Sequence, residues 1–195
     1  MRYWLKKGFT LIELLIVIAI ISILAGVLFV SIGQAPLQRS RDAKRVADMN
    51  EIQKALGLYL NDNKDLPDET YSADGSLAGW EVSFLSNFME YLAPYIPAKI
   101  RDPINSGPPT SMFNVRPDGT FFYNYYYYNF PNAGTNYGCP WTGSFAVLGF
   151  RSVEIMDKST LPKAQCGPQP CAGGGTPGVC RDWSTEFDYS VFILP

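Results

Sequence analysis

The feature that most constrains this chain is an abrupt change near its N-terminus from a basic head to a long apolar run. The head ends at Gly8, and residues 14–30 are aliphatic or aromatic apart from one serine and one glycine. A single carboxylate, that of Glu13, lies at the start of the apolar run. Because a charge is costly in lipid, we expect Glu13 to have a function and a partner.

The junction between head and apolar run resembles the class III leader and N-terminal helix of type IV pilins and of type II secretion pseudopilins. The resemblance is carried by Lys6-Lys7-Gly8-Phe9-Thr10-Leu11-Ile12-Glu13, and with the helix it extends to about Pro67. In that family a dedicated membrane peptidase cuts after the glycine and the new N-terminal residue is methylated. The resemblance therefore implies cleavage between Gly8 and Phe9, N-methylation of Phe9, and a role for Glu13 in assembly.

The order of the segments agrees with this resemblance. A secretory signal peptide places its apolar stretch before the cleavage site. Here the cut would precede the apolar stretch, so that only the basic head is lost. The stretch from Leu14 to Ile32 matches the roughly 20 residues that span a bilayer. The alternative is an uncut signal-anchor helix in which Glu13 reaches back to the interface.

Charge counting alone does not orient the apolar helix, because basic residues lie on both sides of it. The cysteines decide the orientation, since an even number in the C-terminal part suits disulfides in an oxidising compartment. We therefore expect the C-terminal part to lie outside the cytoplasm. The four cysteines are Cys139, Cys166, Cys171 and Cys180.

Disulfides explain these cysteines better than a zinc site does. Zinc sites use paired Cys-x-x-Cys spacings, and this chain has neither such a pair nor any histidine. Four cysteines allow three connectivities. We expect the sequential one, Cys139–Cys166 and Cys171–Cys180, which staples two loops rich in glycine and proline.

Length and charge limit the remaining possibilities. The chain has 195 residues, and after the leader and helix some 135 remain for one globular domain. From Asn61 to Pro195 there are 14 acidic and 8 basic side chains, a net charge of −6, which repels nucleic acid. We expect a leader at 1–8, a transmembrane and assembly helix at 9–33, an amphipathic helical half at 34–62 and an extracytoplasmic domain at 63–195.

The second half of the helix is amphipathic. Gly33 and Pro36 mark a weak point after the apolar run. Apolar residues then recur at steps of three and four, which predicts one face packed on a sheet. This face comprises Ala43, Val46, Met49, Ile52, Leu56 and Tyr59, with Arg41, Lys44, Asp48, Glu51 and Lys54 between them. The helix is expected to end at Asn61-Asp62-Asn63.

The rest of the chain predicts an α+β fold, with the long N-terminal helix packed on a small antiparallel sheet and a loop-rich, disulfide-stapled C-terminal region. Apolar spacing predicts a short amphipathic helix over residues 84–95. Strands are expected at 120–130, 145–150 and 189–194. The tyrosine-rich first strand could stack nucleic-acid bases, but it has little interleaved Arg or Lys, so we expect core and filament surface instead.

Sites for metals or catalysis are weakly indicated. The carboxylates of Asp182, Glu186 and Asp188 could bind calcium, as the distal loop of secretion pseudopilins does, but a solvated acidic face fits better because no loop pattern accompanies them. A chain without histidine cannot form a Ser-His-Asp or Cys-His arrangement. It has no phosphate-binding glycine loop either. We expect no enzyme activity, no cofactor and no resident metal.

The sequence thus predicts a structural filament subunit of the type IV pilus kind. Its expected partners are identical subunits, prepilin peptidase, the inner-membrane assembly platform and, before assembly, membrane lipid. We expect a single-pass inner-membrane precursor that becomes a cell-surface or periplasmic filament. The alternatives are a pseudopilin of a type II secretion or DNA-uptake system, and a membrane-anchored extracellular binding module that does not polymerise.

Overall fold

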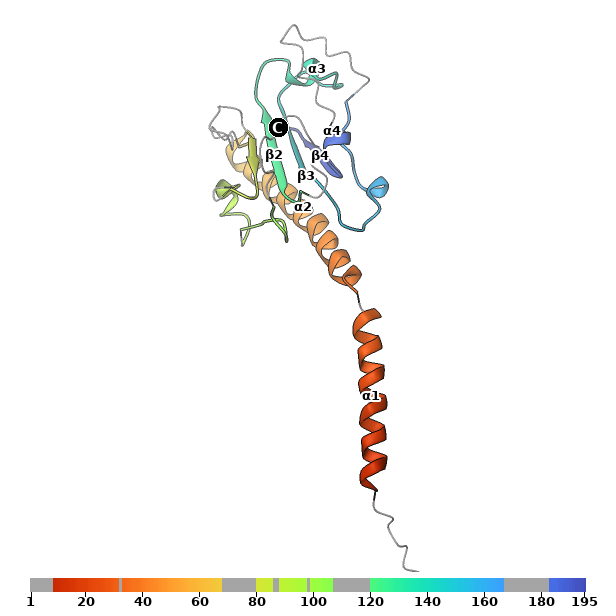
Figure 1. The fold of residues 1–195 in the computed structure, drawn as a ribbon. Helices are drawn as coiled ribbons and strands as arrows, with labels where there is room; N and C mark the ends of the chain where they lie inside the picture. Colours follow the sequence, from red (N-terminus) through yellow and green to blue (C-terminus); the bar gives the residue numbers. More distant parts are fainter. Residues whose placement is uncertain are drawn as a thin grey trace, which may run out of the picture. The chain divides into compact units, whose positions relative to one another are not determined.

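The chain divides into two compact units, Met1–Gln38 and Arg39–Pro195, which are considered separately. The computed structural model describes residues 9–31, 33–67, 80–85, 88–97, 99–106, 120–166 and 183–195 (Figure 1).

The first unit consists mainly of helix α1, Leu11–Ser31. Its large aliphatic side chains from Leu11 to Leu24 are exposed within the single chain. The next helix, α2, spans Ala35–Asn63, so the helical path is interrupted at the weak point expected from Gly33 and Pro36. Pro36 lies in the first turn of α2, where its missing N–H leaves no hydrogen bond unmade. Among the residues that the structure describes, no helix meets the length and hydropathy expected of a membrane span.

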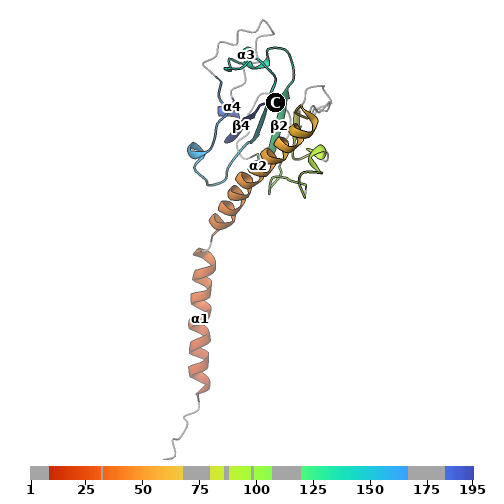
Figure 2. The ribbon, with the colours of Figure 1, turned by 180° about the vertical axis from the view of Figure 1, so that it is seen from behind.

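The second unit packs α2 against a four-stranded antiparallel sheet of order β1-β2-β3-β4 (Figures 1 and 2). This confirms the predicted α+β fold. Three strands match the predicted ones, whereas β1 was missed because it has only three residues. The strands are β1 Trp80–Val82, β2 Tyr123–Tyr128, β3 Phe145–Phe150 and β4 Tyr189–Ile193, and the short helices are η1 Glu90–Leu92, α3 Ala133–Asn136, η2 Lys158–Thr160 and α4 Trp183–Glu186.

Alternate tyrosines of β2 face α2 and explain the unusual composition of this strand. Side chains alternate between the faces of a strand, so Tyr123, Tyr125 and Tyr127 share one face and are almost fully buried there. Their hydroxyl groups donate to Asp48 Oδ2 at 2.6 Å, to the carbonyl of Pro67 at 3.0 Å and to Asp65 Oδ1 at 2.6 Å, respectively. The rings therefore form core rather than a stacking platform, and each buried hydroxyl has a partner.

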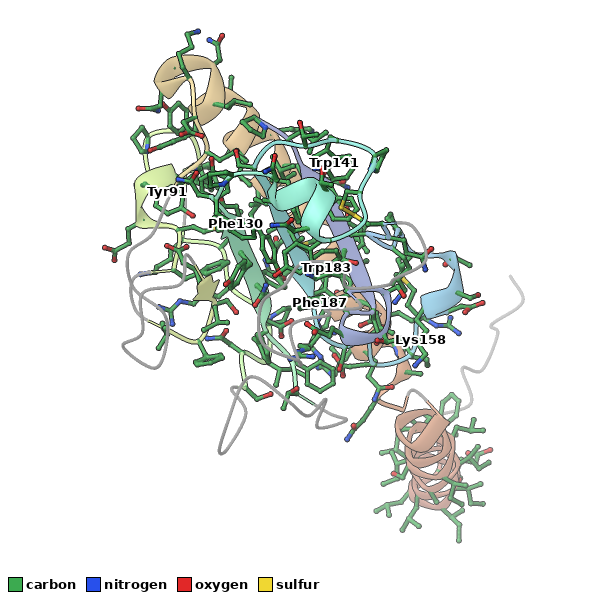
Figure 3. The ribbon with its side chains drawn as sticks, turned by 90° about the horizontal axis from the view of Figure 1, so that it is seen from above. Tyr91, Phe130, Trp141, Lys158, Trp183 and Phe187 are labelled. Carbon is green, nitrogen blue, oxygen red and sulfur yellow. A yellow bond between two sulfur atoms is a disulfide. The ribbon has the colours of Figure 1, made fainter. Side chains whose placement is uncertain are left out.

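A second, largely aromatic cluster covers the opposite face of the sheet (Figure 3). Phe145 stacks on Tyr128 with ring centroids 4.6 Å apart, and Trp183 donates its indole N–H to the Tyr128 hydroxyl at 3.0 Å. The short helices α3 and α4 supply residues to this cluster, so both faces of the sheet are covered. Its buried members are Tyr128, Ala133, Tyr137, Cys139, Phe145, Val147, Ala164, Trp183 and Phe187.

The buried face of α2 differs from the predicted one in its N-terminal half. Ala43, expected on the packed face, is exposed, whereas Asp48, expected among the outward positions, is 6% exposed. Asp42 and Arg45 are completely buried. The reason is that buried ion pairs, together with the partly buried Val46, hold this half of the helix to the rest of the unit. The apolar prediction holds for Met49, Ile52 and Leu56 further along.

The amphipathic helix predicted over residues 84–95 is wrong for the described part of that region. Only the single 3₁₀ turn of η1 forms there, and residues 86 and 87 lie outside the described residues. Met89 has a left-handed backbone with φ of 50°, which no continuous helix accommodates. Its N–H is bound by the buried carboxylate of Glu81 at 2.9 Å instead of by a helical carbonyl. The apolar spacing reflects packing of Phe88 and Leu92 into the core.

Gly149 provides a test of the packing between β3 and β4. A Cβ at this position would overlap the carbonyl oxygen of Tyr189 and lie 3.3 Å from Ser190 Cα. We expect Gly149→Ala to lower the free energy of unfolding by about 1–3 kcal/mol, because backbone must shift to admit the methyl group.

Gly57→Ala is the matched control for Gly149→Ala. A Cβ at position 57 meets nothing within 4 Å, and the helix should gain about 0.5–1 kcal/mol of stability. Urea unfolding of the full chains in detergent, followed by tyrosine and tryptophan fluorescence, measures both. Equal stabilities would show that β3 and β4 pack less tightly than described.

Candidate functional site

The candidate site lies at the start of α1, where the sequence predicts processing and assembly. Gly8 lies outside the described residues, and Phe9 is 85% exposed. The first helical hydrogen bond runs from the Leu14 N–H to the carbonyl of Thr10 at 3.3 Å, which makes Thr10 the residue that caps the helix. Glu13 is therefore in the first turn, where a negative charge is stabilised by the helix dipole.

Thr10 and Glu13 satisfy each other's hydrogen bonds. The backbone N–H and the hydroxyl group of Thr10 donate to Glu13 Oε2 at 2.8 and 2.7 Å. The Glu13 N–H points back to Thr10 Oγ1 at 3.4 Å. This reciprocal arrangement is a capping box, which occurs where Ser or Thr precedes Glu by three residues. The capping box was not among the predicted features, although Thr10-Leu-Ile-Glu13 has the required spacing.

The disulfide between Cys139 and Cys166 forms as predicted. It joins the segment after α3 to the segment that precedes α4 in the sequence, and Cys139 contributes to the aromatic cluster. Cys171 and Cys180 lie outside the described residues, so the second predicted bridge stays a prediction.

Of the three candidate calcium ligands, Asp182 lies outside the described residues. Asp188 is 3% exposed, and its Oδ2 accepts the N–H of Val153 at 2.9 Å while Oδ1 lies 3.9 Å from Lys158 Nζ. Its role in the described structure is thus to hold the segment that follows β3. Within the described ranges, no group of three or more His, Cys, Asp or Glu residues is placed to hold a metal ion, and Glu186 belongs to no such group.

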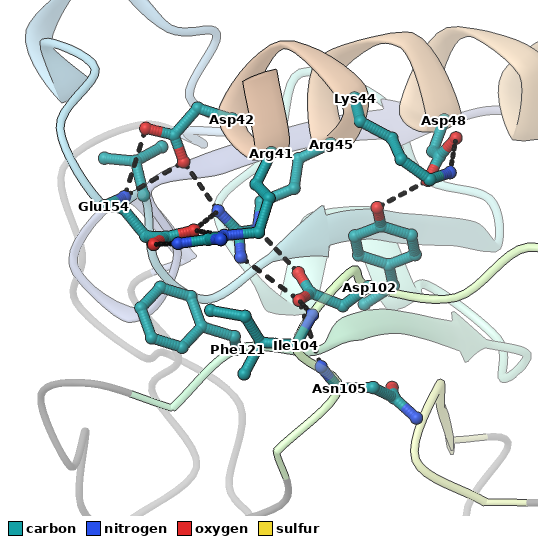
Figure 4. A network of polar contacts seen from close by, with 12 residues as sticks. Arg41, Asp42, Lys44, Arg45, Asp48, Asp102, Ile104, Asn105, Phe121 and Glu154 are labelled. Carbon is teal, nitrogen blue, oxygen red and sulfur yellow. Dashed lines mark hydrogen bonds and ion pairs between the residues drawn. The ribbon is translucent and has the colours of Figure 1, made fainter. Parts of the chain in front are cut away.

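A buried ionic network joins α2 to two loops that are distant in sequence (Figure 4). The Arg45 guanidinium group makes a two-pronged contact with Asp102, with Nε to Oδ2 at 2.7 Å and Nη2 to Oδ1 at 3.2 Å. Its Nη1 donates to Asp42 at 2.6 Å and to Glu154 at 3.0 Å. The ring of Phe121 lies 4.6 Å from the guanidinium carbon. Every side of Arg45 is therefore engaged, as a buried cation requires.

Asp42 and Glu154 carry the negative side of this network. Burial alone raises the pKa of the Asp42 carboxyl, but N–H donors from Glu154, Ile155 and Met156, together with Arg45, outweigh it and hold the pKa below its ordinary value. Hydrogen bonding from Arg41 is the main cause that lowers the pKa of Glu154. Both carboxylates are therefore more easily ionised in the folded chain than in the unfolded one.

These pKa values predict a loss of stability in acid. A carboxyl whose pKa is lowered by folding contributes stability that is present above its ordinary pKa and disappears as the pH falls through the folded value. The ordinary values are 3.8 for Asp42 and 4.5 for Glu154. We expect the free energy of unfolding to fall below about pH 4.5, measured by urea titration at a series of pH values. Asp42→Asn should reduce this pH dependence, and an unchanged slope in that variant would exclude Asp42 as a contributor.

Comparisons with known proteins identify the N-terminal segment. The family description "Prokaryotic N-terminal methylation motif" matches residues 5–29. Over 57 residues the chain is 51% identical to the type IV wide pilus major component PilA4 of Thermus thermophilus, a stretch that covers 29% of this chain and 43% of that relative. The chain thus matches less than half the length of the pilin. No solved structure matches the chain.

The match to the methylation motif includes the capping box formed by Thr10 and Glu13 and the exposed aliphatic surface of α1. The second unit has the helix-on-sheet fold that the strand and helix patterns predict. Pilins are structural rather than catalytic proteins. On this basis, the N-terminal segment of the chain is similar to that of type IV pilins and carries their N-terminal methylation motif.

Proposed function

We propose that the chain is the structural subunit of a type IV pilus-like filament. In this proposal it is made as a precursor, cut between Gly8 and Phe9, methylated at Phe9 and assembled through α1. The observation that carries the proposal is the junction at the start of α1, where a methylation motif places one capped carboxylate at the head of an exposed aliphatic helix. The relative's printed role as a major pilus component supports a pilus over a secretion pseudopilus.

The proposed mechanism of assembly depends on an ion pair between Glu13 and a cation of another subunit. Thr10 occupies Oε2 of the Glu13 carboxylate, and among the described residues Oε1 has no hydrogen-bond partner. When aliphatic helices pack around it, the charge loses its contact with water and requires compensation. Cleavage creates a methylated amine at Phe9, and this amine in a neighbouring subunit supplies the positive charge. The pair fixes the register of the subunits.

The aliphatic surface of α1 supplies the packing area. Residues such as Leu11, Ile12 and Ile23 are 81%, 67% and 67% exposed in the single chain. We infer that this surface meets membrane lipid before assembly and identical subunits afterwards, with the second unit outside the cytoplasm. The contact is heterologous and does not close on itself, so it builds a filament rather than a ring. Prepilin peptidase and an inner-membrane assembly platform are the implied partners, and no catalytic role is proposed.

The test is the N-terminal mass of protein from sheared surface filaments. We expect filament protein to begin at N-methyl-Phe9, and a Gly8→Val precursor to remain uncut in the membrane because the resemblance implies a cut directly after a glycine. Gly57→Ala, which changes a glycine outside the motif, should be processed normally.

Other outcomes favour the alternatives. An assembled chain that begins at Met1 would contradict the proposal. A chain that keeps its leader and never enters filaments would favour a membrane-anchored binding module. A processed chain found only in short periplasmic fibres of a secretion or DNA-uptake system would identify a pseudopilin.

A further inference from the structure

Residues 161–166, which we call the strap, run beside the edge strand β4. The N–H of Ser190 in β4 donates to the carbonyl of Pro162 at 3.0 Å. The N–H of Ala164 donates to Ser190 Oγ at 2.9 Å. Ser190 is fully buried and Ala164 is 3% exposed, so the strap covers this part of the sheet edge closely.

The strap is fixed at its far end by a covalent bond. Cys166, its last residue, is bridged to Cys139 (Figure 3, yellow bond). Between the two ends, Lys163 Nζ donates to the carbonyl of Phe187, and Ala164 packs in the cluster with Trp183. The bridge thus attaches the strap to the segment after α3, whereas the hydrogen bonds attach the strap to β4.

An uncovered edge strand is a template for pairing with another chain. β4 would be such an edge, because its sequence around Val191, Phe192 and Ile193 is apolar and carries no charge. The strap occupies the backbone N–H and the hydroxyl oxygen of Ser190 in the first half of β4. Pro162 has no N–H, so the strap does not itself offer a full row of donors to an incoming strand.

We propose that the Cys139–Cys166 bridge acts as a clamp that keeps the strap on β4 and so prevents β4 of one copy from pairing with a second copy. The three hydrogen bonds of the strap contribute less than the conformational entropy lost when six residues are ordered. The covalent clamp removes part of that entropy in advance. A chain without the bridge therefore releases the strap and exposes the edge of β4 at Ser190. This inference does not depend on whether the chain forms filaments.

Hydrogen exchange of the full chain in detergent tests the clamp. The test variant combines Cys139→Ala with Cys166→Ala, which leaves no unpaired thiol from this bridge. We expect the Ser190 amide to exchange at least about tenfold faster in this variant, with β3 amides from Ala146 to Leu148 unchanged as the internal reference for folding. The matched control, Cys171→Ala with Cys180→Ala, removes two cysteines but keeps the clamp, and should leave Ser190 protected.

Association is the second measurement. In sedimentation, the clamp-free variant should form additional dimers as its concentration rises, and the control should not. Unchanged protection of Ser190 with β3 intact would overturn the proposal, and so would an opened strap without added association. If the double variant unfolds, Ser190→Ala decides: it removes the acceptor of the Ala164 N–H while the bridge remains. A strap that stays protected in Ser190→Ala supports the clamp, and one that opens shows that the hydrogen bonds, not the bridge, hold it.

Discussion

Replacing Glu13 by leucine is expected to abolish most filament formation while leaving membrane insertion and folding intact. The substitution removes a charge from an apolar helix, so insertion should be unchanged or improved. Inside the filament, the amine of Phe9 in a neighbouring subunit would then be buried without its carboxylate. Breaking a buried ion pair typically costs about 3–5 kcal/mol, so filament yield should fall by at least about tenfold. Filament yield relative to membrane-bound monomer, at equal expression, is the measurement.

The capping box makes it possible to separate the charge of Glu13 from its local hydrogen bonds. Glu13→Gln keeps an acceptor for Thr10 but removes the charge, and it should impair assembly nearly as much as Glu13→Leu. Thr10→Val removes the capping hydroxyl but keeps the charge, and should cost only about 1 kcal/mol of helix stability. If Glu13→Gln assembles normally and Thr10→Val does not, Glu13 acts through the helix start rather than through an ion pair.

The second large effect is expected at Arg45. Arg45→Met should lower the free energy of unfolding by about 3–5 kcal/mol, because Asp42, Asp102 and Glu154 would be left around a buried space without their shared cation. Arg45→Lys should recover little of this loss, since an ammonium group cannot make the two-pronged contact with Asp102. Chemical unfolding at neutral pH measures both variants.

The matched control for Arg45 is an ion pair in which both side chains are exposed. Lys99 pairs with Glu90 at 3.2 Å, and their side chains are 40% and 66% exposed. Exposed pairs contribute about 0–1 kcal/mol, so Lys99→Ala should change stability little. A similar loss of stability in both variants would mean that the buried network contributes no more to the free energy of unfolding than an ordinary surface pair does.

The N-terminal elements could be predicted because their signals are local. The junction around Gly8 and Glu13 is a continuous motif, and the apolar spacing of Met49, Ile52 and Leu56 follows the helix period. Strands β2, β3 and β4 were predicted for the same reason, from short apolar runs separated by turn residues. The signal for the capping box is also local, because Thr10 and Glu13 are three residues apart.

The ionic network could not be predicted because its partners are distant in sequence. Arg45 meets Asp102 across 57 residues and Glu154 across 109. Nothing in a single sequence distinguishes such an arginine from one on a solvated helix face, and the neighbouring Arg41 and Lys44 are indeed partly exposed. The predicted helix near Met89 failed for a related reason, since the carboxylate of Glu81 redirects a backbone N–H that local spacing assigns to a helix.

The tyrosines of β2 also determine how this domain responds to force. Their hydroxyl groups attach the sheet to Asp48 within α2 and to Asp65 and Pro67 just beyond its end. A load applied along the helix axis strains these attachments together, so sliding requires several of them to rupture at once. A load that lifts one end of the helix breaks them in sequence and meets less resistance. We therefore expect the domain to resist a load along the axis of α2 more strongly than a load that lifts one end of the helix.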